Sequence, residues 1–304
     1  MQMARILAAA DIGSNTVHLL VAATDGELVT RIDNLSEWVG LGEVVARSGF
    51  ISNERVDHLL QAVKECRRVA QSRKAESLYV FATEAMRSAK NHDAVLQKIQ
   101  AETGIKVDLI TPQREVELSL AGSYLDVDEE NPELFFEVGG GSAQIALIKD
   151  GALKMHSSVP IGTGKVIAQS GLMNPCEPAA LKHAEKYIAD VLKDVVAPRR
   201  PPKSVVASGG VIRGLWRAVH PDGEKNIFRE ELEFLRWTTA RMSVDRIGSR
   251  FGVKQRRAQT LLPGSLVYLA LMEKFGVSEI TVSEFGVREG AILEMARGSR
   301  TKKS

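Results

Sequence analysis

Two stretches of the chain share one pattern: an apolar run ends near an acidic residue, a glycine-containing turn follows, and a second apolar run leads back. The first stretch covers residues 5–23 and has Asp11 before its turn, and the second covers residues 134–149 and has Glu137 there. Apolar runs of this length, bounded by turn residues, predict buried β-strands. The sequence therefore predicts two similar β-hairpins, each with a carboxylate at its tip.

The segments after each hairpin predict a similar order of elements in both halves of the chain. Glycine, proline and N-capping residues mark many of the boundaries, because they start or stop helices. In the first half we expect strands at 5–10, 17–23, 27–34, 78–82 and 105–110, a loop or short turns at 34–49, and helices at 52–69, 91–104 and 114–124. In the second half we expect strands at 134–138, 144–149, 152–158, 204–207 and 279–282, a surface connection at 197–203, and helices at 178–196, 211–219, within 229–275 and at 288–297.

Two copies of a three-strand meander, each followed by alternating helices and strands, predict an α/β fold with mixed sheets. We expect one domain over residues 1–124 and a second over residues 125–287, with the C-terminal helix, 288–300, as a candidate addition to the first. Ligands of α/β folds bind beyond the carboxyl ends of the strands. We therefore expect the ligand in a cleft between the two domains.

The composition is that of an ordinary globular protein. Of the 304 residues 44% are hydrophobic and 26% are charged, and 40 Lys and Arg against 38 Asp and Glu leave a formal net charge of +2. This balance does not steer the whole protein toward nucleic acid or membranes. Cys66 and Cys176 are too few for a disulfide framework or a zinc site, and no apolar run approaches the ~20 residues of a membrane span. We expect a cytoplasmic protein without a signal peptide and without DNA or membrane partners.

The glycine-rich turns have the composition of anion-binding sites, because glycine lets backbone N–H groups approach an anion closely. A carboxylate beside bound phosphate needs a cation between the two, so Asp11 and Glu137 predict a metal ion. A further strand-to-helix turn offers the N-terminus of a helix, which favours anions. We expect phosphate to contact Gly13, Ser14 and Asn15 in the first turn, Gly139, Gly140, Gly141 and Ser142 in the second, and Ser208, Gly209 and Gly210 in the third.

Six segments together resemble the exopolyphosphatase and guanosine pentaphosphate phosphohydrolase (Ppx/GppA) family. They are AADIGSNTVHLL around Asp11, FATEAMRSAKN at 81–91, ITPQREVELSLAG at 110–122, FFEVGGGS through Glu137, SVVASGGVIRGL around Ser208, and TVSEFGVREGAIL near the C-terminus. They occur in the family's order and span nearly the whole chain. The resemblance implies two RNase H-like domains of the actin, Hsp70 and sugar-kinase type, with mixed sheets facing an interdomain cleft, in the short two-domain form.

The resemblance also implies an activity: Mg²⁺-dependent removal of the terminal phosphate of inorganic polyphosphate, or of the 5′ γ-phosphate of guanosine pentaphosphate. Phosphoryl transfer requires mainly positioning and charge neutralisation. Asp11 and Glu137 are then the Mg²⁺ ligands, and Arg87 is a guanidinium fork for phosphate oxygens. Glu115 matches the family's catalytic glutamate, which accepts a proton from the attacking water. A homodimer is a candidate assembly, because members of the family are often dimers.

Some positions depart from the family pattern. Glu137 stands where the family has aspartate, and Arg114 stands where the family often has an acid, so Arg114 either adds phosphate affinity or changes the surroundings of the base. The segment 162–165, GTGK, is similar to part of a phosphate-binding loop and makes Lys165 a candidate phosphate contact. The segment 246–257 is similar to a DNA-reading helix pair, but an isolated amphipathic basic helix is the commoner structure for it.

Two other functions stay open on the sequence alone. An ATP-dependent small-molecule kinase of the same superfamily shares the two glycine hairpins, although the segments around Arg87 and Glu115 favour the phosphohydrolase. A polyphosphate or guanosine pentaphosphate sensor with weak or no activity is the other alternative, and Glu137 and Arg114 motivate it. The sequence does not separate polyphosphate from guanosine pentaphosphate as the preferred substrate.

Overall fold

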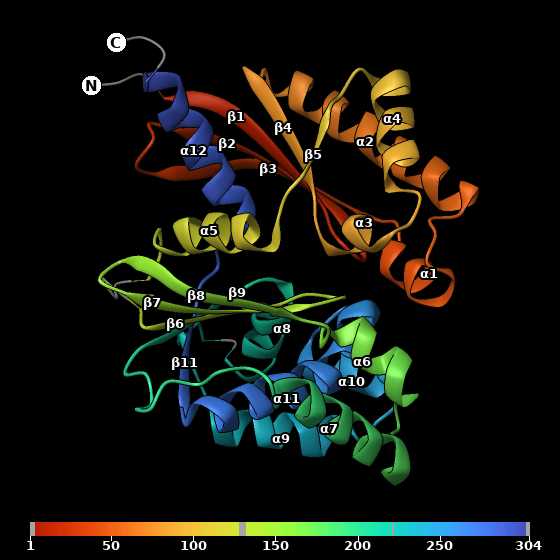
Figure 1. The fold of residues 1–304 in the computed structure, drawn as a ribbon, viewed down its shortest axis with the longest axis vertical. Helices are drawn as coiled ribbons and strands as arrows, with labels where there is room; N and C mark the ends of the chain where they lie inside the picture. Colours follow the sequence, from red (N-terminus) through yellow and green to blue (C-terminus); the bar gives the residue numbers. More distant parts are fainter. Residues whose placement is uncertain (1–3, 128–131, 221, 302–304) are drawn as a thin grey trace. The chain divides into compact units, whose positions relative to one another are not determined.

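The computed structural model describes residues 4–127, 132–220 and 222–301, with side chains up to residue 298. The chain divides into two compact units: residues 1–125 with 285–304 form unit 1, and residues 126–284 form unit 2. Each unit contains one mixed β-sheet with helices packed against it (Figure 1). In the described part of the chain no helix is both long enough and apolar enough to cross a lipid bilayer.

Unit 1 has a five-stranded sheet in the order β3-β2-β1-β4-β5. Its first three strands form an antiparallel meander, and β4 and β5 run parallel to β1. The strands are β1 (Arg5–Ile12), β2 (Thr16–Thr24), β3 (Val29–Trp38), β4 (Ser77–Ala82) and β5 (Val107–Leu109). The helices are α1 (Leu41–Ser48), α2 (Asn53–Ser72), α3 (Glu84–Ser88), α4 (His92–Thr103), α5 (Pro112–Ser123) and α12 (Val287–Thr301).

The alternation of side chains along β1 gives the unit 1 sheet two buried faces. Ala8 and Ala10 belong to the core that α2 covers, whereas Leu7 and Ala9 belong to the core that α5 and α12 cover. Because successive residues of a strand point to opposite faces, Asp11 lies on the face of α5 and α12. This alternation decides which helices surround the predicted metal ligand.

Glycines bring α5 and α12 unusually close together. A Cβ atom on Gly290 would lie 1.8 Å from the carbonyl oxygen of Leu118, and one on Gly122 would lie 2.0 Å from that of Gly286. Glu289 is 2% exposed, and its carboxylate accepts from the backbone N–H of Gly286 and pairs with Arg31 on β3. These contacts hold the C-terminal helix against the N-terminal sheet.

Unit 2 has a six-stranded sheet in the order β10-β11-β9-β6-β7-β8. Its large core contains Phe136 and Phe275, whose rings meet edge to face, together with the fully buried Tyr268. The strands are β6 (Leu134–Val138), β7 (Ala143–Lys149), β8 (Ala152–Val159), β9 (Val205–Ser208), β10 (Asn226–Phe228) and β11 (Glu279–Val282). The helices are α6 (Thr163–Ser170), α7 (Pro178–Leu192), α8 (Gly210–Val219), α9 (Arg229–Thr239), α10 (Val244–Phe251) and α11 (Gln255–Phe275).

The two units repeat one plan. The order β3-β2-β1-β4-β5 in unit 1 corresponds to β8-β7-β6-β9-β11 in unit 2, with the same antiparallel and parallel pairings. The repeat extends to sequence, because residues 39–49, VGLGEVVARSG, match residues 161–171, IGTGKVIAQSG. In both copies the segment forms a helix of eight residues that ends at a left-handed glycine, Gly49 or Gly171.

Some expected elements were wrong. Residues 34–49 are not a loop, because β3 continues to Trp38 and α1 follows, with Leu41 and Val45 buried in the core. Residues 246–257 are not a single helix, because Gly252 adopts a left-handed conformation and separates α10 from α11. The first of these segments makes its stabilising contacts far along the sequence, and a local pattern does not show such contacts.

Candidate active site

Three of the predicted site residues in unit 1 follow three neighbouring parallel strands. Asp11 is the second-to-last residue of β1, Arg87 lies in α3 directly after β4, and Glu115 lies in the first turn of α5 after β5. Since β1, β4 and β5 are adjacent and parallel, their carboxyl ends meet at one edge of the sheet. The fold therefore gathers these residues where α/β proteins bind ligands.

Glu115 is held by Arg87. The Nη2 atom of Arg87 lies 3.0 Å from Oε2 of Glu115, and its Nη1 atom donates to the carbonyl oxygen of Ile110 at 2.7 Å. Both side chains are largely buried, at 18% and 16% exposure. The hydroxyl of Thr111 caps α5 by accepting from the N–H of Arg114, which fixes the turn that carries Glu115. Arg87 therefore orients the carboxylate that the sequence assigns as the base.

Replacing Arg87 with lysine is expected to lower kcat for phosphate release about tenfold, with little change in the unfolding temperature. One ammonium group cannot replace a planar fork that bonds Ile110 and Glu115 at the same time. Steady-state kinetics and thermal unfolding measure the two effects. Arg68→Lys is the matched control, because Arg68 pairs with Glu65 on the exposed side of α2. Equal activity of Arg87→Lys and wild type would contradict this role.

The first glycine turn lies against the start of α1. The carbonyl oxygen of Ser14 accepts from the N–H of Gly42 at 2.6 Å, and that of Asn15 accepts from Val39 and Gly40, each at 2.9 Å. In a planar trans peptide the C=O and N–H groups point in opposite directions. The N–H groups that follow these carbonyls therefore point away from α1, as an anion-binding turn requires.

The hydroxyl of Ser14 has a protein partner that the sequence did not reveal. Its Oγ donates to Oε2 of Glu84 at 3.1 Å, and the other carboxylate oxygen of Glu84 accepts from Ser88 at 2.9 Å. Ser14 itself is 9% exposed. In unit 1 the serine hydroxyl thus fixes the turn to α3.

The second glycine turn is held in the same way by the start of α6. The carbonyl oxygen of Gly139 accepts from Thr163 at 2.9 Å, and that of Gly140 accepts from Gly164 at 2.8 Å and from Lys165 at 3.1 Å. The N–H groups of Gly140 and Gly141 are consequently directed away from α6. The GTGK segment therefore acts here through its backbone, as a support for the turn.

Close packing explains why residue 162, the first residue of the GTGK segment, is a glycine. A Cβ atom on Gly162 would lie 2.5 Å from the backbone of Gly140 and Gly141. Two residues further along, a Cβ atom on Gly164 would lie 3.1 Å from the carbonyl oxygen of Gly140, and one on its counterpart Gly42 in unit 1 would lie 3.0 Å from the Cβ of Ser14. Each turn is thus fixed by a neighbouring helix that approaches to backbone contact.

The third predicted turn lies beside Glu137. Ser208 pairs with Glu137 in the parallel register of β9 and β6. Gly209 has a φ of +97°, and a Cβ atom there would lie 3.1 Å from Cγ of Glu137. A glycine is needed for both reasons. The turn therefore places the N-terminus of α8 next to Glu137, the second-to-last residue of the first strand of unit 2.

Arg257 is a cation at this helix terminus that the sequence prediction did not single out. Its Nη1 atom donates to the carbonyl oxygen of Gly210 at 2.5 Å, and its side chain packs on Gly214. Burial, together with the neighbouring charge of Arg217, lowers the pKa of Arg257. A half-buried cation beside the start of α8 adds positive potential to that turn.

Arg114 points to the C-terminal helix. It forms an ion pair with Glu294 of α12 and lies 3.6 Å from Glu117. These contacts tie α5 to α12 and account for an arginine at this position. Arg114 thereby acts in the packing around Glu115.

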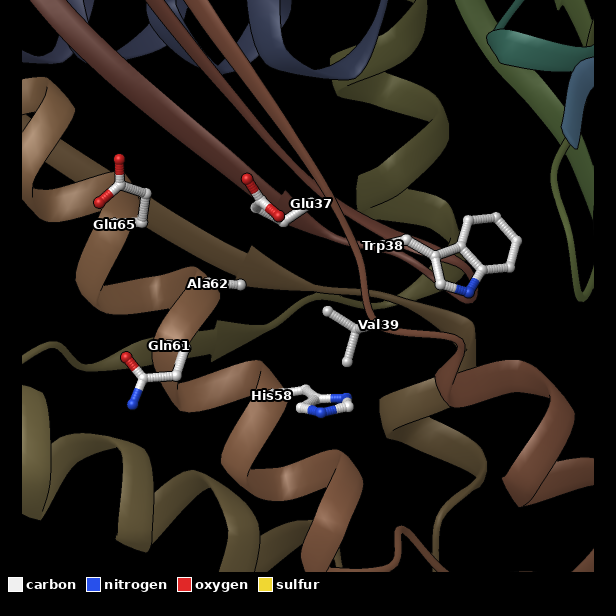
Figure 2. A pocket seen from close by; sticks show the side chains of 7 residues that line it. All are labelled: Glu37, Trp38, Val39, His58, Gln61, Ala62 and Glu65. Carbon is white, nitrogen blue, oxygen red and sulfur yellow. The ribbon is translucent and has the colours of Figure 1, made fainter. Parts of the chain in front are cut away.

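An open cavity of about 430 Å³ lies elsewhere in unit 1, between the end of β3 and α2 (Figure 2). Its lining residues are Glu37, Trp38, Val39, His58, Gln61, Ala62 and Glu65. Glu37 pairs with Val17, whose side chain belongs to the core under α2. The cavity is therefore on the opposite face of the sheet from Asp11, and none of the predicted site residues lines it.

Comparison with known proteins identifies the family. The model of the Ppx/GppA phosphatase family matches residues 20–298, which is most of the chain. The chain belongs to this family. Exopolyphosphatase 1 of Mycobacterium leprae is 26% identical over 304 residues, which cover 93% of this chain and 87% of that protein. Exopolyphosphatase 1 of Mycobacterium tuberculosis has the same identity and covers 93% of this chain and 86% of its own.

Solved structures of the Ppx/GppA family share the fold. The crystal structure of an Aquifex aeolicus member has a TM-score of 0.82 at 24% identity and covers 97% of this chain and 99% of its own. An exopolyphosphatase from Cytophaga hutchinsonii has a TM-score of 0.86 at 22% identity and covers 97% of this chain and 98% of its own. The expected α/β fold of the actin-like type, with two mixed sheets, is confirmed.

The sequence prediction missed contacts that shape the two turns of this Ppx/GppA phosphatase. Glu84 holds Ser14, and the matching segments 39–49 and 161–171 support the two turns. The sequence does contain a signal for the two supporting segments, because both have GxGxV, alanine and SG at equal spacing. A search for internal repeats would have assigned both segments the same structural role.

Proposed function

We propose that this Ppx/GppA phosphatase hydrolyses the terminal phosphoanhydride bond of inorganic polyphosphate, with Glu115 as the general base. The observation that carries the proposal is the position of Glu115, a largely buried carboxylate that Arg87 fixes at the same sheet edge as Asp11. The exopolyphosphatases among the relatives support polyphosphate as the substrate. Guanosine pentaphosphate, whose 5′ γ-phosphate is joined by the same type of bond, is the alternative substrate.

The residues divide the chemistry among them. The backbone N–H groups of the glycine turns bind phosphate oxygens and need no reorganisation during the reaction. Glu115 orients a water molecule and accepts its proton as the water attacks the terminal phosphorus in line with the leaving oxygen. The leaving group departs as a chain that is shorter by one phosphate. Arg87 keeps the carboxylate in place throughout.

The acids fit Mg²⁺ as a cofactor. Mg²⁺ prefers oxygen ligands and is usually held by one or two carboxylates, phosphate oxygens and water. Among the residues that the structure describes, no three His, Cys, Asp or Glu side chains gather into a metal-binding group. The acids that precede the two glycine turns, Asp11 and Glu137, are the carboxylates that would hold Mg²⁺, which when bound neutralises phosphate charge.

Removing divalent metal with a chelator is expected to abolish phosphate release, and adding Mg²⁺ is expected to restore it. In Asp11→Asn the Mg²⁺ concentration for half-maximal activity should rise at least about tenfold, because a neutral amide binds a hard cation weakly. Asp57→Asn, on the exposed side of α2, is the control and should behave as wild type. Full activity in the chelator would rule out the metal.

The substrate assignment is tested by measuring phosphate release from long-chain polyphosphate and from guanosine pentaphosphate side by side. A higher kcat/KM for polyphosphate supports the exopolyphosphatase, and a higher value for the nucleotide assigns the pentaphosphate phosphohydrolase. Release from neither substrate would contradict both and favour a sensor. Transfer of phosphate from ATP to a small-molecule acceptor would instead indicate a kinase.

A further inference from the structure

A chain of hydrogen bonds leads from the second glycine turn into the sheet of unit 2. Nε2 of Gln144 donates to Oγ of Ser142 at 3.3 Å, and Oε1 of Gln144 lies 2.8 Å from Nε2 of His156. Ser142 is the last residue of the turn, Gln144 lies on β7, and His156 lies on β8. Gln144 is 1% exposed and Ser142 is 8% exposed, so both side chains need hydrogen-bond partners.

The chemistry of the three groups fixes the direction of this chain. The Oε1 atom of Gln144 is a carbonyl oxygen and can only accept, so Nε2 of His156 must carry the proton. The same amide must then present its NH₂ group to Ser142, whose Oγ accepts that hydrogen bond. The O–H of Ser142 consequently points away from Gln144.

The turn determines what this hydroxyl can reach. Ser142 follows Gly141, whose carbonyl oxygen accepts from the N–H of Gly162, so the N–H of Ser142 is directed away from α6 like those before it. In the described part of unit 2 no protein acceptor for the Ser142 O–H is found. A phosphate oxygen in the turn is an acceptor that suits both donors of Ser142.

We propose that His156 is a positioning residue for phosphate binding and acts through Gln144 and Ser142. The inference rests on the proposed function, because it assigns phosphate to the second turn. His156 donates to Gln144, Gln144 donates to Ser142, and the hydroxyl of Ser142 donates to phosphate. Hydrogen bonds in such a chain polarise one another in the same direction, which strengthens the last donor.

Thr16 is the residue of unit 1 that corresponds to Ser142, because its carbonyl oxygen accepts from the N–H of Gly13 as that of Ser142 accepts from the N–H of Gly139. The Oγ1 atom of Thr16 lies 2.8 Å from Nε2 of His18, the counterpart of Gln144 in the strand register. A histidine nitrogen donates or accepts according to its tautomer, whereas an amide NH₂ only donates and leaves the serine O–H available. The second turn is therefore the one in which the hydroxyl at this position is fixed as a donor.

A double-mutant cycle tests this coupling by measuring the dissociation constant of tripolyphosphate with Mg²⁺ by calorimetry. All variants are made in the Glu115→Gln background, so that the probe is not hydrolysed. We expect Ser142→Ala to weaken binding about tenfold, since it removes a hydrogen bond to a charged ligand. We expect His156→Phe to weaken binding about three- to tenfold and to have no further effect when Ser142 is already alanine.

Two further variants separate positioning from a general effect on the fold. His156→Gln keeps an N–H donor near the place of Nε2 and should restore most of the affinity, and Gln144→Met should reproduce His156→Phe. His183→Phe, at an exposed position on α7, is the matched control and should leave the affinity unchanged. An equal loss from His156→Phe in both backgrounds, or no rescue by glutamine, would overturn the inference. The cycle measures binding and not hydrolysis. If the wild-type protein releases no phosphate, the proposed function is contradicted, but the cycle still tests whether His156 acts through Ser142.

Discussion

Replacing Glu115 with glutamine is expected to lower kcat for phosphate release by about 10²–10⁴-fold, the usual contribution of a general base. The amide cannot accept the proton of the attacking water. Its carbonyl oxygen can still accept from Nη2 of Arg87, so the position of the side chain and the fold are retained. KM should change little, because the glycine turns, which we propose bind the phosphates, are unchanged in this variant. Initial rates of phosphate release over a range of polyphosphate concentrations measure both parameters.

Glu117→Gln is the matched control for this variant. Glu117 lies two residues further along α5, where its carboxylate accepts from Gln113 and is 41% exposed. Its loss should change kcat less than twofold. Equal losses in the two variants would mean that the effect comes from the charge of α5 as a whole, and an unchanged kcat in Glu115→Gln would remove Glu115 as the base.

Gly290→Ala is expected to lower the free energy of unfolding by at least about 2 kcal/mol and the unfolding temperature by about 5 °C or more. The new methyl group would lie 1.8 Å from the carbonyl oxygen of Leu118. This oxygen belongs to the backbone of α5, so no side-chain rotation can relieve the clash. α12 would have to move away from α5, which also displaces the helix that carries Glu115. Thermal unfolding and phosphate release measure the two consequences.

Gly298→Ala, on the same helix, separates this clash from an effect on helix propensity. Nothing lies within 4 Å of a Cβ atom on Gly298. In a helix alanine is more favourable than glycine by about 0.8–1.0 kcal/mol, so this variant should be as stable as wild type or slightly more stable. A Gly290→Ala protein with wild-type stability would contradict the close packing of α5 and α12.

Much of the fold follows from local sequence patterns. The two hairpins, the strands at 78–82 and 279–282 and the helix that Ser52 caps were expected, because apolar runs and capping residues mark them clearly. α1 was missed because its eight residues include a glycine and bury few side chains. Its start is fixed by the bond from Gly42 to Ser14, a contact across 28 positions of the chain. Such contacts arise only when the sheet is formed.

In the candidate site, too, local sequence patterns predict some residues, whereas others depend on contacts between distant parts of the chain. Asp11, Glu115 and the glycine turns were predicted as site residues from short segments, since each has a residue type that suits phosphate chemistry. The partners of these residues were not identified. Glu84 reaches Ser14 across 70 positions, and His156 reaches Gln144 through the pairing of β7 and β8, whose register shifts between Leu147 and Ile148. A linear sequence does not show a register of this kind.

The most direct test of hydrolysis at the terminal phosphate is phosphate release from long-chain polyphosphate in ¹⁸O-labelled water with Mg²⁺. Attack of water on the terminal phosphorus predicts that each released phosphate carries one oxygen from the solvent and that the chains shorten one unit at a time. Label in the remaining chain would place the attack on a different phosphorus atom. Release of internal fragments, or no release at all, would contradict the account.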